Sequence, residues 1–590
     1  MATAAPAPNA PPNPPEVLVP QADERRQLLQ AGGGNPSSAA ASHTIETFGP
    51  VVLSHLSKIY TSITSGQTLD KSQTAKFLQD IQHDPELPIT GLDKDVNGFN
   101  DFLLYMSSPS SSALATPERH DLGRPLSNYF ISTSHNTYLT GNQLYSPSST
   151  DAYRNVLLRG CRCLEIDVWD GGSNPREHAD VDEDESQTSK WHSGLHSRFS
   201  EGLGKLKARA RSPSSSSNKE SAPAGEGRAE PRVLHGHTLT KEVTFRAVCH
   251  AIRETAFVAT DLPIIVSLEV HASLEQQEIM VEIMKDVWKG MLVDIEKQQV
   301  EQAEQDIKHL PSPDELRRKI LIKVKWTPDS KTGESNNPVQ HVATNSSEEE
   351  STEGQKEKRK KASKILQALS QLGVYTRGYS FRHFSQPEAL IPTHVFSLSE
   401  QKVIDMHEEN HDALFEHNRY YLMRIFPSGL RVNSSNVEPT FLWRQGAQMV
   451  ALNWQSWDKG MMLNEGMFAG EEGWVLKPEG YLGTLGDTVD AQQPIKRQTL
   501  DLTIELIAGQ NLPLPTGDRH TSGFHPYVKC QLHVGSKSER EAKLDDKKDK
   551  NDDKYKRRSS TAKGVDPDFS REPIRFSNVP GVIEKLSFVR

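Results

Sequence analysis

The sequence predicts a multidomain protein built around a (β/α)8 barrel, with helices before the barrel and a β-sandwich after it. Residues 44–115 carry apolar side chains at helical spacing, residues 120–482 alternate strand-like and helix-like segments, and residues 497–590 alternate apolar and polar side chains with period two. The alternation in the middle predicts a mostly parallel sheet covered by helices, and its length fits about eight strands closed into a barrel.

Composition limits the class of protein. A chain of 590 residues is long enough for roughly three to five domains. The net charge is −10, without a basic signature, so we expect no nucleic-acid partner. The four cysteines indicate a reducing, cytosolic compartment, and we interpret the pair in "GCRCLE" as strand core rather than as a metal motif. No apolar run reaches about 18 residues, so any membrane contact is expected to be peripheral.

The N-terminal region divides into a tail and a helical segment. Residues 1–43 are rich in Pro, Ala, Gly and Ser, lack the features of a signal peptide, and are expected to be disordered. Residues 44–115 are expected to form a degenerate EF-hand-like region. Its "DKDVNG" (93–98) matches the start of an EF-hand calcium loop, but the twelfth position is Leu104, where the loop needs a bidentate Glu. We therefore predict helical packing without a bound ion there.

The barrel strands are predicted from short β-branched runs. The candidates are "SNYFIST", "CRCLEIDVW", "RVLHGH", "PIIVSLEV" and "KILIKVK" in the first half (120–326), and "RYYLMRIFP" and "QMVALNWQ" in the second half (363–482). An insert at 171–231 interrupts the first half, and residues 327–362 separate the halves. Both segments are rich in Ser or charge and could not bury a core, so we expect both to be disordered.

The β-sandwich is predicted at 497–590 from runs such as "QTLDLTIELIAGQNLP" and "HPYVKCQLHVG". A charged insert at 535–563 interrupts it, and the sequence stops at "LSFVR", still in a strand-like run. We expect this sandwich to be truncated in the sequence.

Polar side chains gather at, or toward, the C-terminal ends of the predicted barrel strands, where barrel proteins carry their chemistry. They are His135 and Asn136 on the first candidate, Glu165 and Asp167 on the second, His235 on the third, Glu269 on the fourth, Lys323 and Lys325 on the fifth, and Arg424 on a later one. Residues two apart on a strand point to the same side. Charges inside a barrel are costly unless they are paired or bind a ligand, so the set predicts a functional site.

Each of these residues has a structural explanation when taken alone. A strand-end histidine is usually a turn residue, and alternating lysines usually mark a solvent face. Lys323 and Lys325, however, alternate with Ile322 and Val324 on a strand that should be buried on both sides. An all-oxygen ligand set suits calcium or magnesium rather than zinc, cations suit phosphate groups, and two histidines can donate and accept protons. Together these groups predict phosphodiester cleavage.

These residues and their surroundings resemble eukaryotic phosphoinositide-specific phospholipase C, most closely its delta type. The resemblance rests on "PLSNYFISTSHNTYLTGNQL", "GCRCLEIDVWDG", "HGHTLT", "VSLEVHASLEQQ", "KILIKVK", "FSLSE", "RIFPSGLRVNSSN" and "GAQMVALNWQ". It covers about residues 44–590 apart from the inserts. It implies EF-hand-like helices, a barrel split into an X half (120–326) and a Y half (363–482), and a partial all-β C2 domain (497–590).

The resemblance also implies a role for each site residue. The catalytic pair matches His135 and His235, with Glu165 or Glu269 as the base, and the calcium ligands match Asn136, Glu165, Asp167 and Glu269. The residues that hold the inositol 4- and 5-phosphates match Lys323, Lys325, Ser397 and Arg424, with Phe426 beside the ring. The implied activity is calcium-dependent hydrolysis of phosphatidylinositol 4,5-bisphosphate to diacylglycerol and inositol 1,4,5-trisphosphate, through a cyclic phosphodiester, in intracellular signalling.

The chain departs from the family pattern at three places. Phe426 stands where the family usually has Tyr, which removes a hydroxyl beside the inositol ring. No segment before residue 44 is long enough for a pleckstrin-homology domain, so no separate headgroup anchor is expected. His525 stands where calcium-binding C2 domains have Asp, so we do not expect calcium binding by this C2 domain.

Membrane approach is expected to be transient, from the cytoplasm to the cytosolic face of membranes, and the sequence does not identify an upstream activator. The family's apolar rim around the active-site mouth matches Leu144, Leu239 and Leu430. In the first insert, apolar residues recur at near-helical spacing among basic ones, which fits an amphipathic membrane-binding helix: Leu195, Phe199, Leu203 and Leu206. Three glycines in the same stretch, Gly194, Gly202 and Gly204, favour a disordered basic linker instead.

Three other functions compete with this one. The first is a catalytically weak or inactive phosphoinositide-binding signalling protein, although inactive relatives lose catalytic positions and both His135 and His235 are present. The second is a glycerophosphodiester phosphodiesterase, which the set of phosphate-binding cations disfavours. The third is a bacterial-type, metal-independent lipase, which the full carboxylate set disfavours.

Overall fold

The computed structural model describes residues 47–64, 71–82, 98–107, 111, 121–172, 229–236, 238, 240–293, 307, 309–327, 365–483, 494–515, 520–521, 523–535 and 555–590. The predictions for the tail 1–43 and for the calcium-loop residues 93–97 lie outside these residues. So do nearly all of the two inserts predicted at 171–231 and 327–362, including the amphipathic segment in the first insert.

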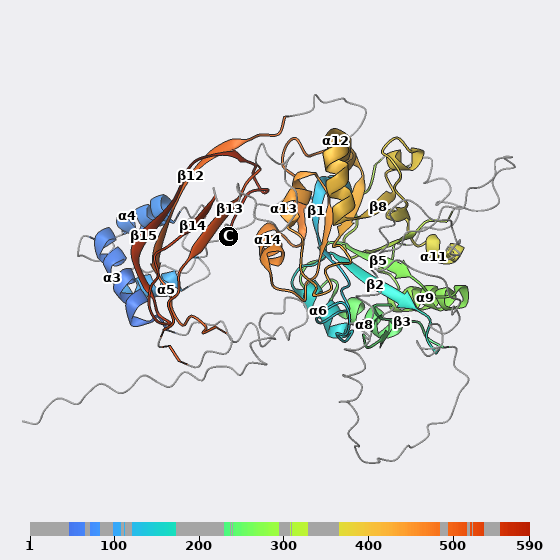
Figure 1. Cartoon of the computed structure of the whole chain (residues 1–590), viewed down its shortest axis with the longest axis horizontal. Coiled ribbons are helices and arrows are strands. Elements are labelled where there is room, and N and C mark those ends of the chain that lie inside the picture. The colour runs from blue at the N-terminus through green and yellow to red at the C-terminus, as the bar shows by residue number, and fades with distance from the viewer. Residues whose placement is uncertain are drawn as a thin grey trace, which may run out of the picture.

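Eight parallel strands close into a barrel (Figure 1). They are β1 (Tyr129–Ser134), β2 (Cys163–Trp169), β5 (Ile264–Val270), β6 (Ile320–Lys325), β7 (Arg377–Tyr379), β8 (His394–Ser399), β9 (Leu422–Phe426) and β10 (Met449–Leu452). Each strand pairs in parallel with the next, and β10 pairs with β1 to close the ring. The predicted (β/α)8 barrel is confirmed.

Helices cover the outside of the barrel. They are α6 (Thr150–Leu158), α8 (Phe245–Thr255), α9 (Leu274–Val287), α11 (Gln367–Ser370), α12 (Glu400–Tyr420), α13 (Pro439–Arg444) and α14 (Lys459–Phe468), with 3-10 turns η3 (Leu126–Asn128) and η4 (Pro387–Leu390). Five of the helices begin at a side chain that accepts a hydrogen bond from a backbone N–H of the first turn: Ser149, Thr244, Ser273, Ser399 and Asp458. These caps fix where the strand-to-helix loops at the C-terminal face end.

One predicted barrel strand is wrong and two were missed. The segment "RVLHGH" contains β3 (Arg232–Val233), which pairs antiparallel with β2 and with β4 (Val243–Thr244). Val233 pairs with Val168, so β3 is a short addition at the C-terminal end of β2, and His235 still reaches the barrel mouth. The missed strands are β7, which has only three residues around Gly378, and β8, which was not among the strand candidates. The short strand β11 (Trp474–Leu476) pairs antiparallel with the start of β1.

Side chains that face the barrel interior change from apolar to polar along the strands. Near the N-terminal ends the interior is filled by one apolar cluster, which includes Ile131, Cys163, Ile265, Leu321, Val395, Leu422 and Met449. Two residues further along, the same strands carry Thr133, Glu165, Ser267, Lys323, Ser397 and Arg424. Because side chains two apart on a strand share a face, the apolar layer supports a polar layer directly above it.

Helices before the barrel pack against the sheets that follow it (Figure 1). They are α3 (Pro50–Thr64), α4 (Lys71–Lys76), the π-helical turn η1 (Phe77–Ile81) and α5 (Phe99–Met106), which share a small core of Leu56, Phe77, Leu78, Phe102 and Tyr105. The Gly49 N–H donates to Gln510 Oε1 at 2.6 Å, and His55 Nε2 lies 2.9 Å from Asp568 Oδ1. These contacts join the first and last described segments of the chain.

The region after the barrel forms two small sheets that share one core. One pairs β12 (Gln498–Ala508) with β15 (Asp568–Val582), and the other orders β14 (Lys556–Arg558), β13 (Lys529–His533) and β16 (Phe588–Val589). The shared core contains Cys530, Leu532, Ile574, Phe576 and Val579, so the all-β prediction holds, while the C2 assignment stays a prediction.

Strand β14 lies inside the range 535–563 that we expected to be a charged insert. Its charges suit an exposed edge strand, because the guanidinium groups of Arg557 and Arg558 lie over the rings of Phe576 and Tyr527, at 5.3 and 3.7 Å from the ring centres. In the part of the chain that the structure describes, no helix is long and apolar enough to cross a membrane.

Candidate active site

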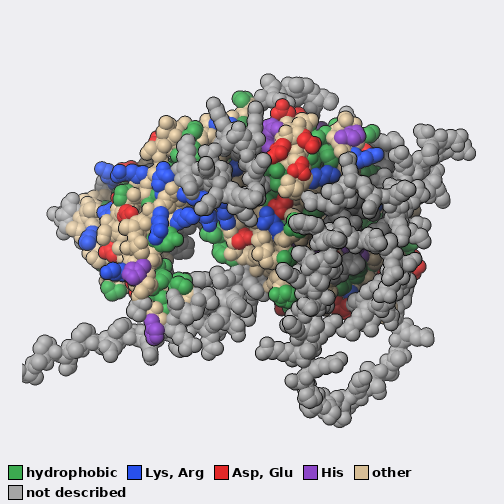
Figure 2. Space-filling view, in the orientation of Figure 1, with side chains coloured by type: hydrophobic (Ala, Val, Ile, Leu, Met, Phe, Trp, Pro, Cys, Tyr) green, Lys and Arg blue, Asp and Glu red, His purple; other side chains and the backbone are tan. Residues whose placement is uncertain are grey.

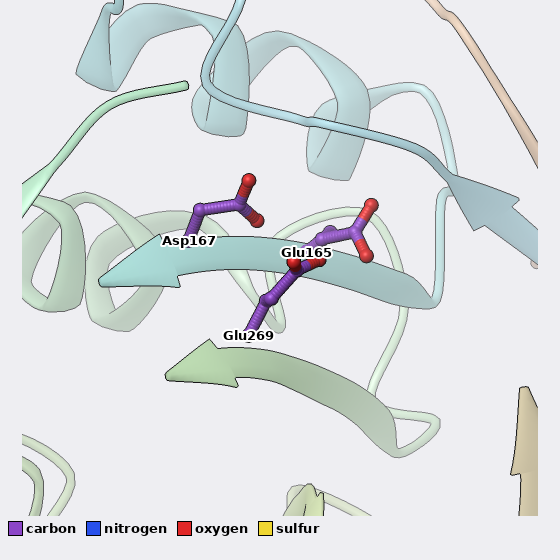
Figure 3. Close-up of side chains that lie close together, drawn as sticks. All are labelled: Glu165, Asp167 and Glu269. Carbon is purple, nitrogen blue, oxygen red and sulfur yellow. The ribbon is translucent and has the colours of Figure 1, made fainter. Parts of the chain in front are cut away.

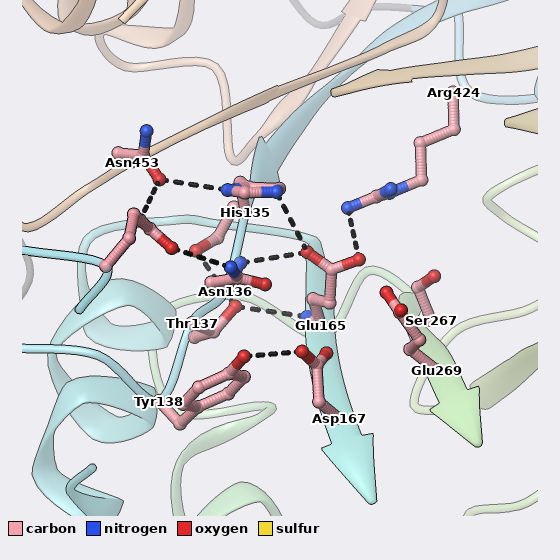
Figure 4. Close-up of polar contacts among 12 residues, drawn as sticks. His135, Asn136, Thr137, Tyr138, Glu165, Asp167, Ser267, Glu269, Arg424 and Asn453 are labelled. Carbon is pink, nitrogen blue, oxygen red and sulfur yellow. Dashed lines mark hydrogen bonds and ion pairs between the residues drawn. The ribbon is translucent and has the colours of Figure 1, made fainter. Parts of the chain in front are cut away.

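Strand β1 ends in the His135–Asn136 pair at the barrel mouth (Figure 4). Asn136 has a φ of 42°, in the left-handed region that Asn tolerates better than most residues. This turn brings the Asn136 N–H to Glu165 Oε2 at 2.8 Å. The turn and the second strand are therefore connected through the side chain of Glu165.

Three carboxylates meet at the ends of β2 and β5 (Figure 3). Glu165, Asp167 and Glu269 each place an oxygen within 4.8 Å of the others, an arrangement that could hold a metal ion. Burial raises the pKa of Asp167 well above its usual range, and the neighbouring Glu269 and Glu165 raise it further. Tyr138 donates its hydroxyl to Asp167 Oδ2 at 2.5 Å, whereas Asp167 Oδ1 is buried without a hydrogen-bond partner among the described residues. A buried carboxylate oxygen without a hydrogen-bond partner is a suitable ligand for a cation.

Two cations lie beside the carboxylates. Arg424 Nη2 is 2.8 Å from Glu165 Oε1, and both side chains are almost fully buried. Burial alone would lower the pKa of Arg424, but the Glu165 carboxylate raises it overall. Lys323 Nζ donates to Ser267 Oγ at 3.1 Å, and burial together with nearby Arg424 lowers the pKa of Lys323 to about 8. The guanidinium thus balances one of the three carboxylates.

The remaining residues of the predicted phosphate site lie on β6, β8 and β9. Burial lowers the pKa of Lys325, which follows Lys323 on the same face of β6. Ser397 pairs with Arg424 in the β8–β9 register, and its Oγ is buried without a hydrogen-bond partner in the described ranges. Phe426, two residues after Arg424, has the Arg424 guanidinium 5.9 Å from its ring centre. The structure therefore places all five predicted substrate-site residues on β6, β8 and β9, within a run of four consecutive barrel strands.

The two histidines interact electrostatically with each other at this cluster. His135 Nδ1 is 2.9 Å from Asn453 Oδ1, its Nε2 is 4.0 Å from Glu165 Oε2, and its ring lies parallel to Phe426 at 6.5 Å between centres. Burial and the nearby His135 lower the pKa of His235, and its Nδ1 is buried without a hydrogen-bond partner among the residues described. The carboxylates of Glu165 and Glu269 also act on the pKa of His235, in the direction that raises it, so both imidazoles interact with the carboxylate cluster.

Exposed apolar side chains stand on two loops at the mouth. Leu430 is 87% exposed and Tyr145 is 69% exposed, whereas Leu144 is half-buried. The Gln143 N–H donates to Val432 O at 3.0 Å, which joins the loop after β1 to the loop after β9. Leu239, the third predicted rim residue, lies outside the described residues.

Four polar residues of the site were missed in the sequence: Tyr138, Gln143, Ser267 and Asn453. Asn453 directly follows β10, so the strand-end criterion that selected His135 would have found it. Ser267 shares the inward face of β5 with Glu269. Tyr138 and Gln143 lie in the loop after β1, where no periodicity in the sequence indicates which way a side chain points.

Comparisons with known proteins agree with this geometry. The family model described as phosphatidylinositol-specific phospholipase C, X domain, matches residues 122–326, and the model of the Y domain matches residues 369–480. The chain belongs to the phosphatidylinositol-specific phospholipase C family. An EF-hand model also matches residues 51–117 of this phospholipase C chain.

Relatives of this phospholipase C chain come from animals and fungi. It is 32% identical to 1-phosphatidylinositol 4,5-bisphosphate phosphodiesterase delta-3 of Mus musculus, over 79% of this chain and 54% of that protein. It is 31% identical to the delta-1 protein of Homo sapiens, over 80% of this chain and 58% of that one. A Candida albicans protein, 1-phosphatidylinositol 4,5-bisphosphate phosphodiesterase 1, is 32% identical over 73% of this chain and 39% of its own length. The chain therefore spans about half the length of these relatives.

A solved structure agrees with the fold. The crystal structure of S. officinalis PLC21 superposes with a TM-score of 0.60 at 22% identity, and the match covers 97% of this chain and 68% of that one.

Proposed function

We propose that this protein is a calcium-dependent phosphoinositide-specific phospholipase C, which hydrolyses phosphatidylinositol 4,5-bisphosphate to diacylglycerol and inositol 1,4,5-trisphosphate. The observation that carries the proposal is the polar layer at the barrel mouth, where three carboxylates, two imidazoles and three cations come from the same end of the barrel strands and their loops. The names of the delta-type relatives, which are 31–32% identical, support the substrate.

Calcium fits the oxygen ligands of the site. Glu165, Asp167 and Glu269 supply carboxylate oxygens, and the buried Asp167 Oδ1 has no hydrogen-bond partner within the described ranges. Asn136 uses its Nδ2 to donate to Gln143, which leaves Oδ1 as the amide atom for a cation. When bound, calcium would lower the pKa of the inositol 2-hydroxyl and balance negative charge.

The protein's own residues would move the protons. Glu165 or Glu269 accepts the proton of the 2-hydroxyl, whose oxygen then attacks the 1-phosphate to form the cyclic phosphodiester. His135 stabilises the charge that develops on the phosphate oxygens, and His235 protonates the departing diacylglycerol oxygen. The same His235 then takes a proton from the water that opens the cyclic phosphate.

The cations would select the headgroup. Lys323, Lys325, Ser397 and Arg424 are proposed to hold the 4- and 5-phosphates, with Phe426 against the inositol ring. The buried Ser397 Oγ and Arg424 Nε, both without a hydrogen-bond partner among described residues, support this assignment because a phosphate would satisfy both.

The apolar rim would bring the mouth to the membrane. We propose that Leu144, Leu239 and Leu430 touch the lipid, and the exposure of Leu430 supports this. The protein would work from the cytoplasm, transiently at the cytosolic face of membranes.

Hydrolysis of phosphatidylinositol 4,5-bisphosphate vesicles tests the proposal. Turnover is measured with calcium, with a chelator, and with His235→Ala, and His250→Ala, an exposed histidine on α8, serves as the matched control. We expect chelation to abolish turnover and His235→Ala to lower it by about 10²–10⁴-fold, while the control keeps it. Calcium-independent turnover, or none in the wild type, contradicts the proposal. Vesicle binding without turnover would instead support a phosphoinositide-binding protein.

A further inference from the structure

A buried row of side-chain amides connects His135 to Asn136. Asn453 Oδ1 lies 2.9 Å from His135 Nδ1 (Figure 4) and accepts a hydrogen bond from Gln143 Nε2 at 3.1 Å. Gln143 Oε1 in turn accepts from Asn136 Nδ2 at 2.8 Å. We call Asn136, Gln143 and Asn453 the amide row. All three are buried, and they come from two places that are far apart in the chain.

The carbonyl of Ser435 fixes the direction of the row. A backbone oxygen can only accept, so the Asn453 atom that lies 3.1 Å from it must be Nδ2. Asn453 Oδ1 then faces His135 and Gln143. Asn453 is also held by its backbone, because its N–H donates to Asn436 Oδ1 at 2.6 Å and its carbonyl accepts from Asn436 Nδ2 at 3.2 Å.

The direction of Asn453 sets that of the next two amides. Gln143 must present Nε2 to Asn453, since two amide oxygens would repel each other. Nε2 also donates at 2.9 Å to Ser434 Oγ, which can accept because Ser434 donates its own hydrogen to Gly141 O at 2.7 Å. Gln143 Oε1 therefore faces Asn136, which must present Nδ2 and keep Oδ1 for another ligand.

The same reasoning fixes the tautomer of His135. An acceptor opposite Nδ1 requires a hydrogen on Nδ1, in the neutral and in the protonated ring. Nε2 is then the ring atom that faces Glu165, at 4.0 Å, and the space above the carboxylates. A neighbouring hydrogen-bond partner is the usual means by which proteins select one imidazole tautomer and ring orientation.

We propose that Asn453 and Gln143 are positioning residues, Asn453 for His135 and Gln143 for Asn136. Their catalytic meaning rests on the proposed function, but the orientations do not. Loss of the Asn453 amide leaves Gln143 held by Ser434, and loss of the Gln143 amide leaves Asn453 held by Ser435. The two substitutions should therefore have different effects.

Asn453→Leu and Gln143→Met in the full chain test this separation. The control is Gln445→Met, which removes a buried bond of the same kind, 2.9 Å from Gln445 Oε1 to His407 Nδ1, away from the site. We expect Asn453→Leu to lower kcat about 10–100-fold with KM within about 2-fold, and to keep the calcium affinity measured by titration calorimetry. We expect Gln143→Met to lower the calcium affinity by about 10–100-fold. Equal effects of both on calcium affinity, or effects no larger than the control's, overturn the proposal.

The tautomer itself is read by nitrogen NMR of histidine-labelled protein, with the His135 signals assigned from His135→Gln. At about pH 8.5, where an ordinary imidazole is neutral, we expect the hydrogen on Nδ1 in the wild type and in Gln143→Met, and a mixture of tautomers in Asn453→Leu. A wild-type hydrogen on Nε2 overturns the proposal. This readout needs no turnover, so an inactive protein would refute the proposed function without refuting the amide row.

Discussion

Arg424→Met tests whether the Arg424 guanidinium neutralises the negative charge of the buried carboxylates when no metal is bound. The guanidinium lies 2.8 Å from Glu165 Oε1, and the two side chains are 3% and 5% exposed. At that distance the attraction is about 6 kcal/mol with an effective dielectric constant of about 20. Loss of one partner of a buried pair costs about 3–5 kcal/mol. Nearby Lys323 also interacts favourably with Glu165, so we expect the lower end, about 3 kcal/mol of unfolding free energy.

Thermal unfolding with chelator and with saturating calcium measures this effect. For a unit of 150–250 residues, about 3 kcal/mol corresponds to a fall in Tm of about 6–12 °C. Calcium bound at the proposed site would supply the positive charge that Arg424 otherwise supplies, so we expect it to raise the Tm of Arg424→Met by several degrees more than that of the wild type. Arg162→Met is the control, because Arg162 is equally buried but donates its hydrogen bonds to backbone carbonyls. Calcium should raise the Tm of Arg162→Met by the same amount as that of the wild type.

Two outcomes would refute this reasoning. Arg424→Met could be as stable as the wild type in chelator, or calcium could raise both Tm values equally. Either result would mean that the Arg424 guanidinium does not supply the positive charge that a metal ion could replace at the carboxylates.

Three further predictions concern the lipid headgroup, the contact between Glu438 before α13 and His533 on β13, and the membrane. Lys325→Ala should reduce turnover of phosphatidylinositol 4,5-bisphosphate about 10-fold, as expected for loss of a charge-assisted contact, and should spare phosphatidylinositol. Burial alone would raise the pKa of Glu438, but His533 at 2.9 Å and Lys459 at 2.5 Å lower it overall. The ionised Glu438 side chain therefore stabilises the fold above its ordinary pKa of about 4.3, and this stabilisation is lost as the pH falls. Glu438→Gln should lower the free energy of unfolding by about 2 kcal/mol at pH 7. It should also make the fall of Tm between pH 6 and pH 3 less steep. Leu430→Ser should weaken vesicle binding about 10-fold, because a buried Leu contributes about 1.5–3 kcal/mol, without changing turnover of a water-soluble inositol phosphodiester.

Each of these has an outcome that contradicts it. Equal losses of Lys325→Ala on both lipids would remove its headgroup role. A Glu438→Gln variant whose Tm depends on pH as steeply as that of the wild type would show that protonation of Glu438 does not change the stability of the protein. Undiminished vesicle binding by Leu430→Ser would remove Leu430 from the membrane contact.

The sequence predicted which polar side chains gather at the barrel mouth, because side chains two apart on a barrel strand point to the same face. Glu165 and Asp167, or Lys323 and Lys325, are two apart, and a strand buried on both sides sends them to the same face of the interior. Polar side chains in such strands therefore identify the layer that binds a ligand. The apolar layer below them follows from the same periodicity.

The contacts that cross the barrel could not be predicted in this way. Arg424 and Glu165 are 259 positions apart (424 minus 165), and nothing in either strand says that they meet. The missed strand β7 has a glycine between Arg377 and Tyr379, and its buried arginine is stabilised by the Trp326 ring, 3.9 Å away. Gln143 lies in a loop, and its partner Asn453 is 310 residues further along the chain. Such pairs depend on barrel closure, which local patterns do not encode.

The contact between the first helices and the last strands has a consequence for synthesis of the chain on the ribosome. Helix α3 is made early, but its partners Gln510 and Asp568 follow 461 residues after Gly49 and 513 residues after His55. At about 5–20 residues per second, that delay is roughly 25–100 s. The barrel strands emerge in between and can close before β12 exists. The surface of the N-terminal helices that meets the sheets must therefore stay exposed, or be bound by a chaperone, until Gln510 and Asp568 have left the ribosome.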